Sequence, residues 1–250
     1  MCGRFALKIG KDIFSKQFLL KDLPALQPRY NIAPTQSIVA LRKEKRSGER
    51  IGFSAHWGLI PHWAKDKKIG PKMINARSES APEKPAFRKA AQYRRCLIPA
   101  SGFYEWKRQG EVKQPFYIYP SEAGTASLGG PCFPFAGLWE SWEKPESEET
   151  VQSVTILTTR ANPFMEAVHD RMPVMLPPEQ WDSWLDPETQ FTKADWEAMT
   201  SPLGEDLLAM YPVSRDVNSP RNDSPELIEP ENCEKPFQPR KVTPNQGELF

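Results

Sequence analysis

The second residue of the chain is a cysteine, and it could do chemistry that an internal cysteine cannot. If Met1 is removed, Cys2 becomes the N-terminal residue and carries an α-amine and a thiol on adjacent carbons. An α-amine titrates near about 7.7–8.0, so a usable fraction is neutral and nucleophilic at cellular pH. Position alone favours a simpler interpretation, a small residue beside a terminus, so the rest of the sequence has to decide.

Three other segments place acid, base and amide side chains close together in the sequence. They are "MINARSES" (73–80), "PASGFYEWK" (99–107) and "VHDRMPVML" (168–176). Considered singly, each has a structural explanation: Asn75 as a turn residue, Glu105 as a paired strand carboxylate and His169 as a hydrogen-bonded histidine at a helix end. Only their combination with Cys2 points to a reaction.

The composition predicts a globular protein without a membrane anchor. The 250 residues are 39% hydrophobic with a mean hydropathy of -0.60, and no apolar run approaches the roughly 20 residues that cross a bilayer. The start of the chain is interrupted by charges, unlike a signal peptide. The four cysteines are far apart and form no C-x-x-C pair. We therefore expect no metal, no cofactor, no disulfide framework and a reducing cytoplasmic location.

The charge distribution leaves nucleic-acid binding possible. The net charge is +1, so the protein as a whole is not a polyanion binder. Residues 61–95 nevertheless hold ten Lys and Arg residues against three acids. This composition suits an ordinary solvated surface, and it equally suits a groove for a phosphate backbone.

The elements that must position these residues are mostly strands. The 26 prolines argue against a helical bundle, and many short β-branched or aromatic runs predict an α+β domain with a barrel-like or strongly bent mixed sheet and a few helices. We expect strands at 37–42, 96–100, 102–108, 115–120, 135–141, 154–159 and 171–176. Helical patterns cover 81–93, 161–170, 177–185 and 192–199. In the second of these, Asn162 is the expected N-cap and Pro163 the first helical residue.

The composition changes near residue 217. We expect one domain over residues 1–216 and a Pro-rich, extended and flexible C-terminal tail over 217–250. The chain ends in "QGELF", which has the form of a short docking peptide. Folding of its last two residues back onto the domain is an equally good interpretation.

Eight ordered motifs together resemble the SOS-response-associated peptidase (SRAP) family, the abasic-site-processing proteins. They lie between Cys2 and about Ser214 and read "MCGRF", "RYNIAPTQ", "WGLIPHWAK", "NARSE", "RCLIPASGFYEW", "FAGLWE", "TILTTRAN" and "HDRMPVML". The resemblance implies a single SRAP-like domain that senses abasic sites in single-stranded DNA during the DNA damage (SOS) response. It also implies that Cys2 cross-links covalently to the lesion after Met1 is lost, a loss attributed in family members to self-processing.

The implied reaction is chemically reasonable for these residues. An abasic site is a masked aldehyde, which forms an imine with an amine; a neighbouring thiol then closes a five-membered thiazolidine. The resemblance makes Glu105 the general acid/base, lets His169 assist at the sugar hydroxyl or in reversal, and lets Asn75 orient the reacting group. Activity would be lyase-like or of the peptidase (hydrolase) type, with self-cross-linking instead of high turnover.

The resemblance also implies DNA-binding residues and partners. Arginine donors would clamp phosphates, and aromatic rings and a proline would stack on or wedge between bases. These residues are Arg4, Pro34, Trp63, Arg77, Trp106 and Arg171. Core packing is a nearly equal alternative for the two tryptophans.

Partners and location follow in the same way. The expected partner is single-stranded DNA containing abasic sites, bound by a monomer in the bacterial cytoplasm, close to the nucleoid during repair. The "QGELF" end is similar to the Gln-x-x-Leu-Phe peptides that dock on the replicative sliding clamp, with Gln246, Leu249 and Phe250 as the contact residues.

Two other interpretations stay open at this point. An N-terminal-nucleophile hydrolase or thiol peptidase would use the Cys2 thiol to attack an acyl group, with His169 as base. Blocking the α-amine would abolish a thiazolidine link but leave part of such thiolate activity. A non-catalytic DNA-binding adapter would keep its function after Cys2→Ala.

Overall fold

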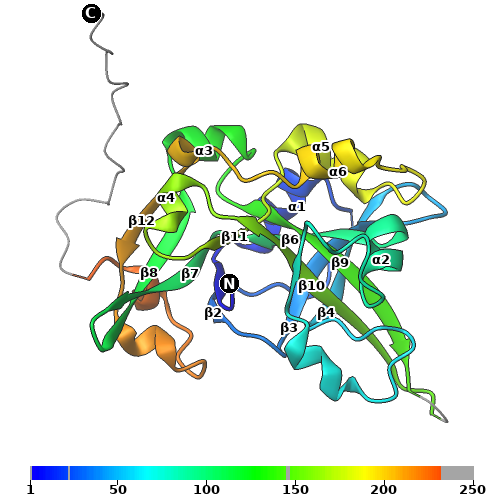
Figure 1. Ribbon diagram of the computed structural model, residues 1–250, viewed down its shortest axis with the longest axis horizontal. Helices are drawn as coiled ribbons and strands as arrows, with labels where there is room; N and C mark the ends of the chain where they lie inside the picture. Colours follow the sequence, from blue (N-terminus) through cyan, green and yellow to red (C-terminus); the bar gives the residue numbers. More distant parts are fainter. Residues whose placement is uncertain (1, 22, 145–146, 232–250) are drawn as a thin grey trace, which may run out of the picture.

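Five strands close into a barrel that forms the larger part of the fold (Figure 1). The computed structural model describes residues 2–21, 23–144 and 147–231. The barrel strands follow the order β10-β4-β3-β6-β9, and β9 pairs in turn with β10. Only the β4–β10 pair is parallel, so the barrel sheet is mixed. The bounds are β3 Ser37–Lys43, β4 Arg50–Trp57, β6 Arg95–Ala100, β9 Phe133–Glu143 and β10 Thr150–Arg160.

Two three-residue strands extend the barrel along the second half of β10. Strand β5 (Asn75–Arg77) runs parallel to β10 and places Asn75 opposite Ile156. Strand β11 (Arg171–Pro173) runs antiparallel to β10 and places Arg171 opposite Arg160. The barrel thereby brings two of the three candidate segments to one strand.

A second sheet of five antiparallel strands packs beside the barrel, with β7, β8 and β12 on the left in Figure 1. Its order is β12-β8-β7-β1-β2, with bounds β1 Phe5–Leu7, β2 Arg29–Ile32, β7 Gly102–Gln109, β8 Val112–Pro120 and β12 Leu208–Pro212. The ring of Phe5 meets the rings of Trp57 and Phe135 of the barrel edge-to-face, with centroids 5.2 and 5.9 Å apart. Such aromatic contacts join the two sheets through strand β1.

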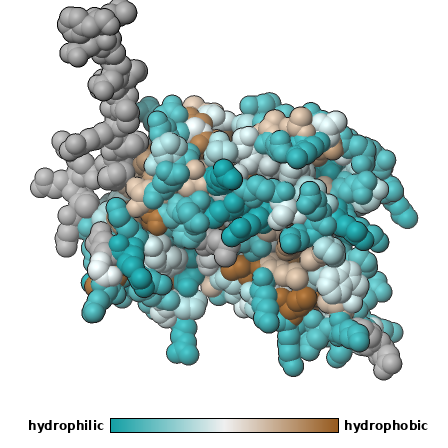
Figure 2. Space-filling view, in the orientation of Figure 1, coloured by the Kyte–Doolittle hydropathy of each residue, from teal (hydrophilic) through white to brown (hydrophobic). Residues whose placement is uncertain are grey.

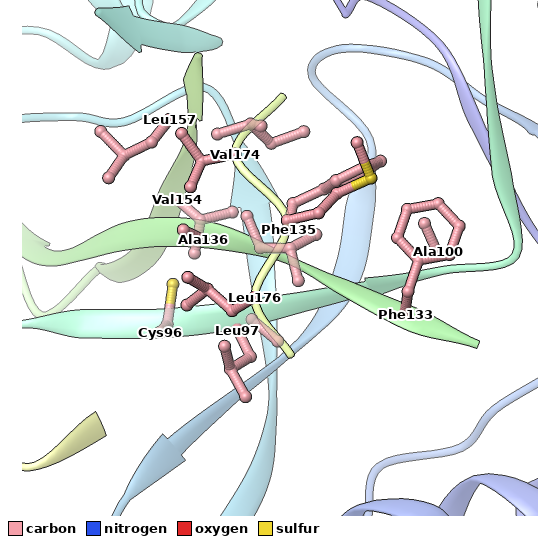
Figure 3. Close-up of a cluster of buried hydrophobic side chains, with 14 of the residues drawn as sticks. Cys96, Leu97, Ala100, Phe133, Phe135, Ala136, Val154, Leu157, Val174 and Leu176 are labelled. Atoms are coloured by element: carbon pink, nitrogen blue, oxygen red, sulfur yellow. The ribbon is translucent and has the colours of Figure 1, made fainter. Parts of the chain in front are cut away.

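The barrel interior is filled with aliphatic and aromatic side chains (Figure 3). The chain after β11 enters this core: Val174 N donates to Leu157 O at 2.9 Å, and Ala136 N donates to Val174 O at 2.8 Å. Val174 and Leu176 are both fully buried there. Each such buried side chain contributes about 1.5–3 kcal/mol to folding.

Six short α-helices lie around the two sheets in the described part of the chain. They are α1 Lys11–Phe18, α2 Arg88–Tyr93, α3 Glu122–Ser127, α4 Pro163–Glu166, α5 Pro178–Leu185 and α6 Lys193–Met199. Amphipathic patterns explain their packing, since α1 buries Phe14 and Phe18 and α5 buries Trp181 and Trp184. Short 3-10 helices occur at Lys67–Lys72, Glu205–Leu207, Arg215–Asn218 and Pro225–Ile228.

The predicted α+β class with a barrel-like mixed sheet is confirmed. Each predicted strand is present, but the one expected at 171–176 ends at Pro173 as β11. The helix expected at 81–93 begins only at Arg88, because residues 81–87, which include two prolines, form turns. The helix expected at 161–170 is reduced to α4, although Asn162 caps it as predicted through Met165 N at 2.9 Å.

Residues 217–231 were expected in a flexible tail, but they pack against strand β2. Val217 and Leu227 are buried, and Asp223 Oδ1 accepts a hydrogen bond from Asn31 N at 3.1 Å. The Asn31 side chain donates to three backbone carbonyls of the segment, those of Val217, Ser219 and Asn222. Residues 217–231 are therefore packed against the second sheet, and Glu231 N donates to Pro212 O at 2.9 Å. Gln246, Leu249 and Phe250 lie outside the described residues.

The surface carries no large apolar face in the view of Figure 2, which shows mostly hydrophilic residues with small separate hydrophobic patches. Within the described ranges, the helices are all too short or too polar to cross a membrane.

Phe135 gives a test of this packing. Its ring is fully buried and meets the rings of Phe5, Phe103 and Phe133. Phe135→Ala should lower the free energy of unfolding by about 3–5 kcal/mol, because it removes contacts that join barrel and second sheet and leaves a cavity. Urea denaturation followed by circular dichroism measures this change. Val112→Ala, at a 40% exposed position, should stay within about 0.5 kcal/mol of the wild type.

Candidate functional site

The register between β1 and β7 brings the start of the chain to Glu105. Phe5 pairs with Phe103 in antiparallel register, and Tyr104 N donates to Arg4 O at 2.9 Å. In antiparallel pairing, residues before Arg4 continue along the residues after Tyr104. Cys2 therefore lies near Glu105, and the Glu105 charge is one of the causes that raise the pKa of the Cys2 thiol.

Asn75 connects strand β5 to the same place. Its Nδ2 donates to Cys2 O at 2.9 Å. Within the part of the chain that the structure describes, its Oδ1 is buried and has no hydrogen-bond partner. A buried amide oxygen without a partner is uncommon. Asn75 thus holds Cys2 with one end of its amide and offers an acceptor with the other.

His169 enters from the turn between α4 and β11. Its Nδ1 lies 3.0 Å from Arg171 N, which donates to the unprotonated nitrogen, and 2.8 Å from Asp170 Oδ1, which accepts when Nδ1 is protonated. The two contacts serve different protonation states of the ring. The side chain is 28% exposed, and its charge lowers the pKa of Glu105, which places it near that carboxylate.

The electrostatics of the site favour neutral forms of the two acids. Burial raises the pKa of Glu105, with Asp170 acting in the same direction and His169 against it. Burial is also the main cause that raises the pKa of the Cys2 thiol far above its ordinary value. With Met1 in place, the thiol is thus kept protonated, and Cys2 is fully buried.

A cavity of about 430 Å³ is lined by charged residues, two of which directly follow His169 in the chain. The lining consists of Arg77, Arg160, Glu166, Asp170 and Arg171. Arg77 and Arg160 are exposed. The sequence predictions name Arg77 but not Arg160, which directly follows the strand expected at 154–159 and is the last residue of β10. A larger cavity of about 1170 Å³, between α2 and α6, contains none of Cys2, Asn75, Glu105 or His169.

Two of the expected phosphate-binding arginines are engaged within the protein. Arg171 forms a bidentate pair with Glu79, at 2.7 and 2.9 Å, and its side chain is 9% exposed. Arg4 Nη1 donates to Asn31 Oδ1 and to Val217 O, both at 2.7 Å. Both guanidinium groups thus stabilise the fold, and their contact with phosphate stays a prediction.

The two tryptophan candidates differ in their exposure and in their contacts within the protein. Trp63 is 52% exposed in a turn after β4, which suits stacking better than core packing. Trp106 is half-buried, donates from Nε1 to Asn218 Oδ1 at 2.7 Å and packs on a small cluster around Tyr104 and Tyr117. Pro34 is half-buried. Its neighbour Thr35 donates to Trp57 O at 2.8 Å, so Pro34 lies near the end of β4 from which the Trp63 turn begins.

The basic segment 61–95 is also only partly available to a ligand. Arg95 is buried, and its guanidinium donates to backbone carbonyls of α2 and of residues 184–189. Arg94 pairs with the buried Glu140. The other eight basic residues of the segment are exposed.

The described residues hold no group of three or more His, Cys, Asp or Glu side chains arranged for a metal ion. The site therefore consists of a thiol, an amide, a carboxyl group and an imidazole, with arginines beside them.

Residues 1–220 match the family model described as SOS response associated peptidase (SRAP). The chain belongs to this family. Among similar proteins, the abasic site processing protein YoqW of Bacillus subtilis (strain 168) is 45% identical over 234 residues, which cover 92% of this chain and 99% of YoqW. The abasic site processing protein HMCES of Xenopus tropicalis is 34% identical, over 91% of this chain and 78% of HMCES.

Solved structures share the SRAP fold of this chain. A protein from Bacteroides thetaiotaomicron matches with a TM-score of 0.72 at 24% identity, over 90% of this chain and 91% of that protein. A phage-related protein from Bordetella bronchiseptica matches with a TM-score of 0.65 at 28% identity, over 86% of this chain and 95% of that protein.

The two arginines of the charged cavity should differ in their effect on stability. Arg171→Met in the SRAP protein should lower the free energy of unfolding by about 1.5–3 kcal/mol, because hydrogen bonds to Glu79 and to Thr158 O are lost. Arg77→Met, at an exposed position, should change it by less than about 0.5 kcal/mol. Urea denaturation of both variants measures the difference, and equal losses would contradict the assignment.

Proposed function

We propose that this protein processes abasic sites in single-stranded DNA and does so by covalent capture through Cys2 after Met1 has been removed. The observation that carries the proposal is the meeting of Cys2 with Asn75, Glu105 and His169, which come from four separate parts of the chain. The names of the relatives YoqW and HMCES, abasic site processing proteins, support the same substrate.

The proposed reaction is a condensation that releases one water molecule. The open-chain form of an abasic site carries an aldehyde at C1′. The α-amine of Cys2 adds to this carbon, and the resulting carbinolamine loses its hydroxyl as water to give an imine. The thiol then adds across the C=N bond: its sulfur bonds to C1′ and its proton passes to the nitrogen. The product is a thiazolidine ring.

The site residues suit this sequence of proton transfers. Because burial raises its pKa, Glu105 keeps a proton to a higher pH than an ordinary carboxyl group and can donate it to the departing hydroxyl. The thiol needs a base, and the Glu105 carboxylate left by that donation can accept its proton. Asn75 holds the Cys2 carbonyl, so it fixes the direction of the amine. The His169 ring, close enough to Glu105 to affect its pKa, can act as the second acid/base group.

With Met1 in place, the raised pKa of the Cys2 thiol does not favour the alternative in which a thiolate attacks an acyl group. Reactive thiolates usually have lowered pKa values beside cations, whereas burial and the Glu105 charge both disfavour a thiolate here. Capture by the amine followed by thiol addition does not need a free thiolate. Lyase-like chemistry at the lesion and self-removal of Met1 by a hydrolytic reaction are both parts of the proposal.

The surroundings of the site suit a single strand. Arg77 and Arg160 line the charged cavity and can neutralise phosphates, and the exposed lysines and arginines of residues 61–95 add salt-sensitive attraction. The exposed ring of Trp63 can stack on an unpaired base. We propose further that the protein acts as a monomer in the cytoplasm and that Gln246, Leu249 and Phe250 dock on the sliding clamp.

Cys2 variants test the covalent step. Mature protein, shown by mass spectrometry to begin at Cys2, should form a slowly migrating adduct on a denaturing gel with an abasic single-stranded oligonucleotide and none with an intact one. Cys2→Ser keeps the amine but lacks the thiol, so it should give an imine that survives the gel only after borohydride reduction. Acetylation of the wild-type α-amine should abolish both products. Absence of any adduct from correctly processed wild type would falsify the proposal.

The pH dependence tests the role of Glu105. The rate of adduct formation at saturating DNA should depend on a neutral amine, whose ordinary pKa is about 7.7–8.0, and on a protonated Glu105, whose pKa burial raises above the ordinary carboxyl value of about 4.3. The rate should rise at low pH as the amine loses its proton and fall at high pH as Glu105 loses the proton that it donates. The profile should therefore be bell-shaped.

Glu105→Gln cannot donate the proton, so it should be slower throughout and lose the dependence on Glu105. Its affinity for intact single-stranded DNA should stay within about twofold of wild type. Equal losses of rate and of affinity would mean that Glu105 has a structural role only.

A further inference from the structure

The turn that carries Trp63 exposes two neighbouring side chains on a fixed backbone. Ala64 N donates to Pro61 O at 2.9 Å, which closes a β-turn with His62 and Trp63 at its two central positions. The His62 side chain is 45% exposed and Trp63 is 52% exposed. We call residues 61–64 the tryptophan turn.

Hydrogen bonds from β9 and β10 hold both ends of the tryptophan turn. Before the turn, Ile60 N donates to Ser153 Oγ at 2.8 Å. After the turn, Trp142 Nε1 donates to Ala64 O at 2.7 Å. Ile60, Ala64 and Trp142 also form a separate buried hydrophobic cluster. An exposed tryptophan is thus carried by a turn whose two flanks are buried.

The buried carboxylate of Glu140 holds the middle of the turn. Its Oε2 lies 2.9 Å from His62 Nδ1 and 3.4 Å from His62 N. Its Oε1 forms an ion pair with Arg94 Nε at 2.5 Å. Glu140 and Trp142 lie two residues apart on β9 and so share one face, and Ser153 is directly opposite Glu140 on β10.

Burial of this carboxylate would be unfavourable without these partners. Glu140 is only 3% exposed, and a buried charge is tolerated when it is paired and hydrogen-bonded. An apolar side chain could fill the same space, so packing alone does not account for a glutamate here. What the carboxylate adds is a directed contact to the ring and backbone of His62.

The tryptophan turn is also joined to the strand that carries Asn75. Leu59 N donates to Met73 O at 3.1 Å, and β5 begins two residues after Met73. Gly58, at a φ of +135°, lies so close to Gly70 that an added Cβ would come within 2.6 Å of the Gly70 carbonyl oxygen. The turn therefore cannot shift freely relative to the candidate site.

We propose that Glu140 is a positioning residue for single-stranded DNA, which holds the tryptophan turn as a preorganised platform on which an unpaired base stacks against Trp63. The His62 side chain connects the Glu140 carboxylate to the turn. Because the turn is ordered before DNA arrives, binding does not have to bear the entropy cost of ordering it. The inference rests on the proposed function for its ligand, but it concerns binding and not the covalent step.

A double-mutant cycle on binding tests the platform. The measurement is fluorescence anisotropy of a labelled, intact single-stranded oligonucleotide, which cannot cross-link. Trp63→Ala should weaken binding on the order of tenfold, the effect of losing one stacked base. Glu140→Gln and His62→Ala should each weaken it about three- to tenfold. In the Trp63→Ala background neither substitution should weaken DNA binding further, because the turn then lacks the ring on which the base stacks.

Two variants separate positioning from general stability. Trp142→Phe keeps the ring packing but removes the bond to Ala64 O, so it should behave like Glu140→Gln and replaces it if that variant fails to fold. Phe14→Leu, in the buried face of α1, lowers stability at a distance and should leave DNA affinity unchanged in both backgrounds.

The outcomes separate this inference from the proposed function. Loss of affinity without loss of the adduct rate at saturating abasic DNA supports the platform. Additive losses with Trp63→Ala, or wild-type affinity of Trp63→Ala or Glu140→Gln, would overturn it even if the wild type cross-links normally. If the wild type forms no adduct but the cycle is non-additive, the platform stands and the covalent function falls.

Discussion

The short antiparallel pairing of β1 with β7 is the constraint on which the site depends. Two paired positions, Phe5 with Phe103 and Ala6 with Gly102, fix where the residues before them can go. A shift of one residue would turn the Cys2 side chain to the other face of the sheet and break its relation to Glu105. The register is in turn fixed by the ring of Phe5, which is locked between Trp57 and Phe135 of the barrel. Core packing thus determines the position of the chain end.

The same packing sets the electrostatics. Cys2 and Glu105 are both buried, and burial raises the pKa of each group, which favours its neutral form. The arrangement keeps a thiol unreactive toward solvent while leaving it next to a proton donor. An N-terminal amine is less affected by such burial than a thiolate would be, since its reactive form is uncharged. The site therefore favours chemistry that begins at nitrogen.

The sequence predicted most of the barrel because its strands are β-branched or aromatic runs of ordinary length. It missed the strands β1, β2, β4, β5 and β12 and the helices α1 and α3. Strands β1 and β5 have three residues each, too few for a periodic pattern, and α1 is short and begins after a glycine without a capping side chain. The four central site residues came from motif resemblance, and the structure brings them together.

The pairing of Arg171 with Glu79 and of Arg4 with Asn31 could not be predicted from the sequence. The sequence does not indicate whether an arginine will bind a phosphate of a ligand or an acceptor within the protein. Arg160 and Glu140 were missed for the converse reason, since each looks like an ordinary residue of a strand until its neighbours are known.

Buried polar groups hold several irregular segments of this fold in place. The Asn31 side chain on β2 donates hydrogen bonds to residues 217–222. The ion pair of Glu79 with Arg171 lies at the charged cavity, and Glu140 contacts His62 in the tryptophan turn. An apolar core could have supplied the same volume, but it could not have fixed directions as hydrogen bonds do. The tryptophan turn, which has little regular pairing of its own, is held in this way by side chains of the long strands β9 and β10. Burial of apolar side chains in the barrel thus contributes most of the free energy of folding, and the buried polar contacts fix the positions of side chains on the irregular segments.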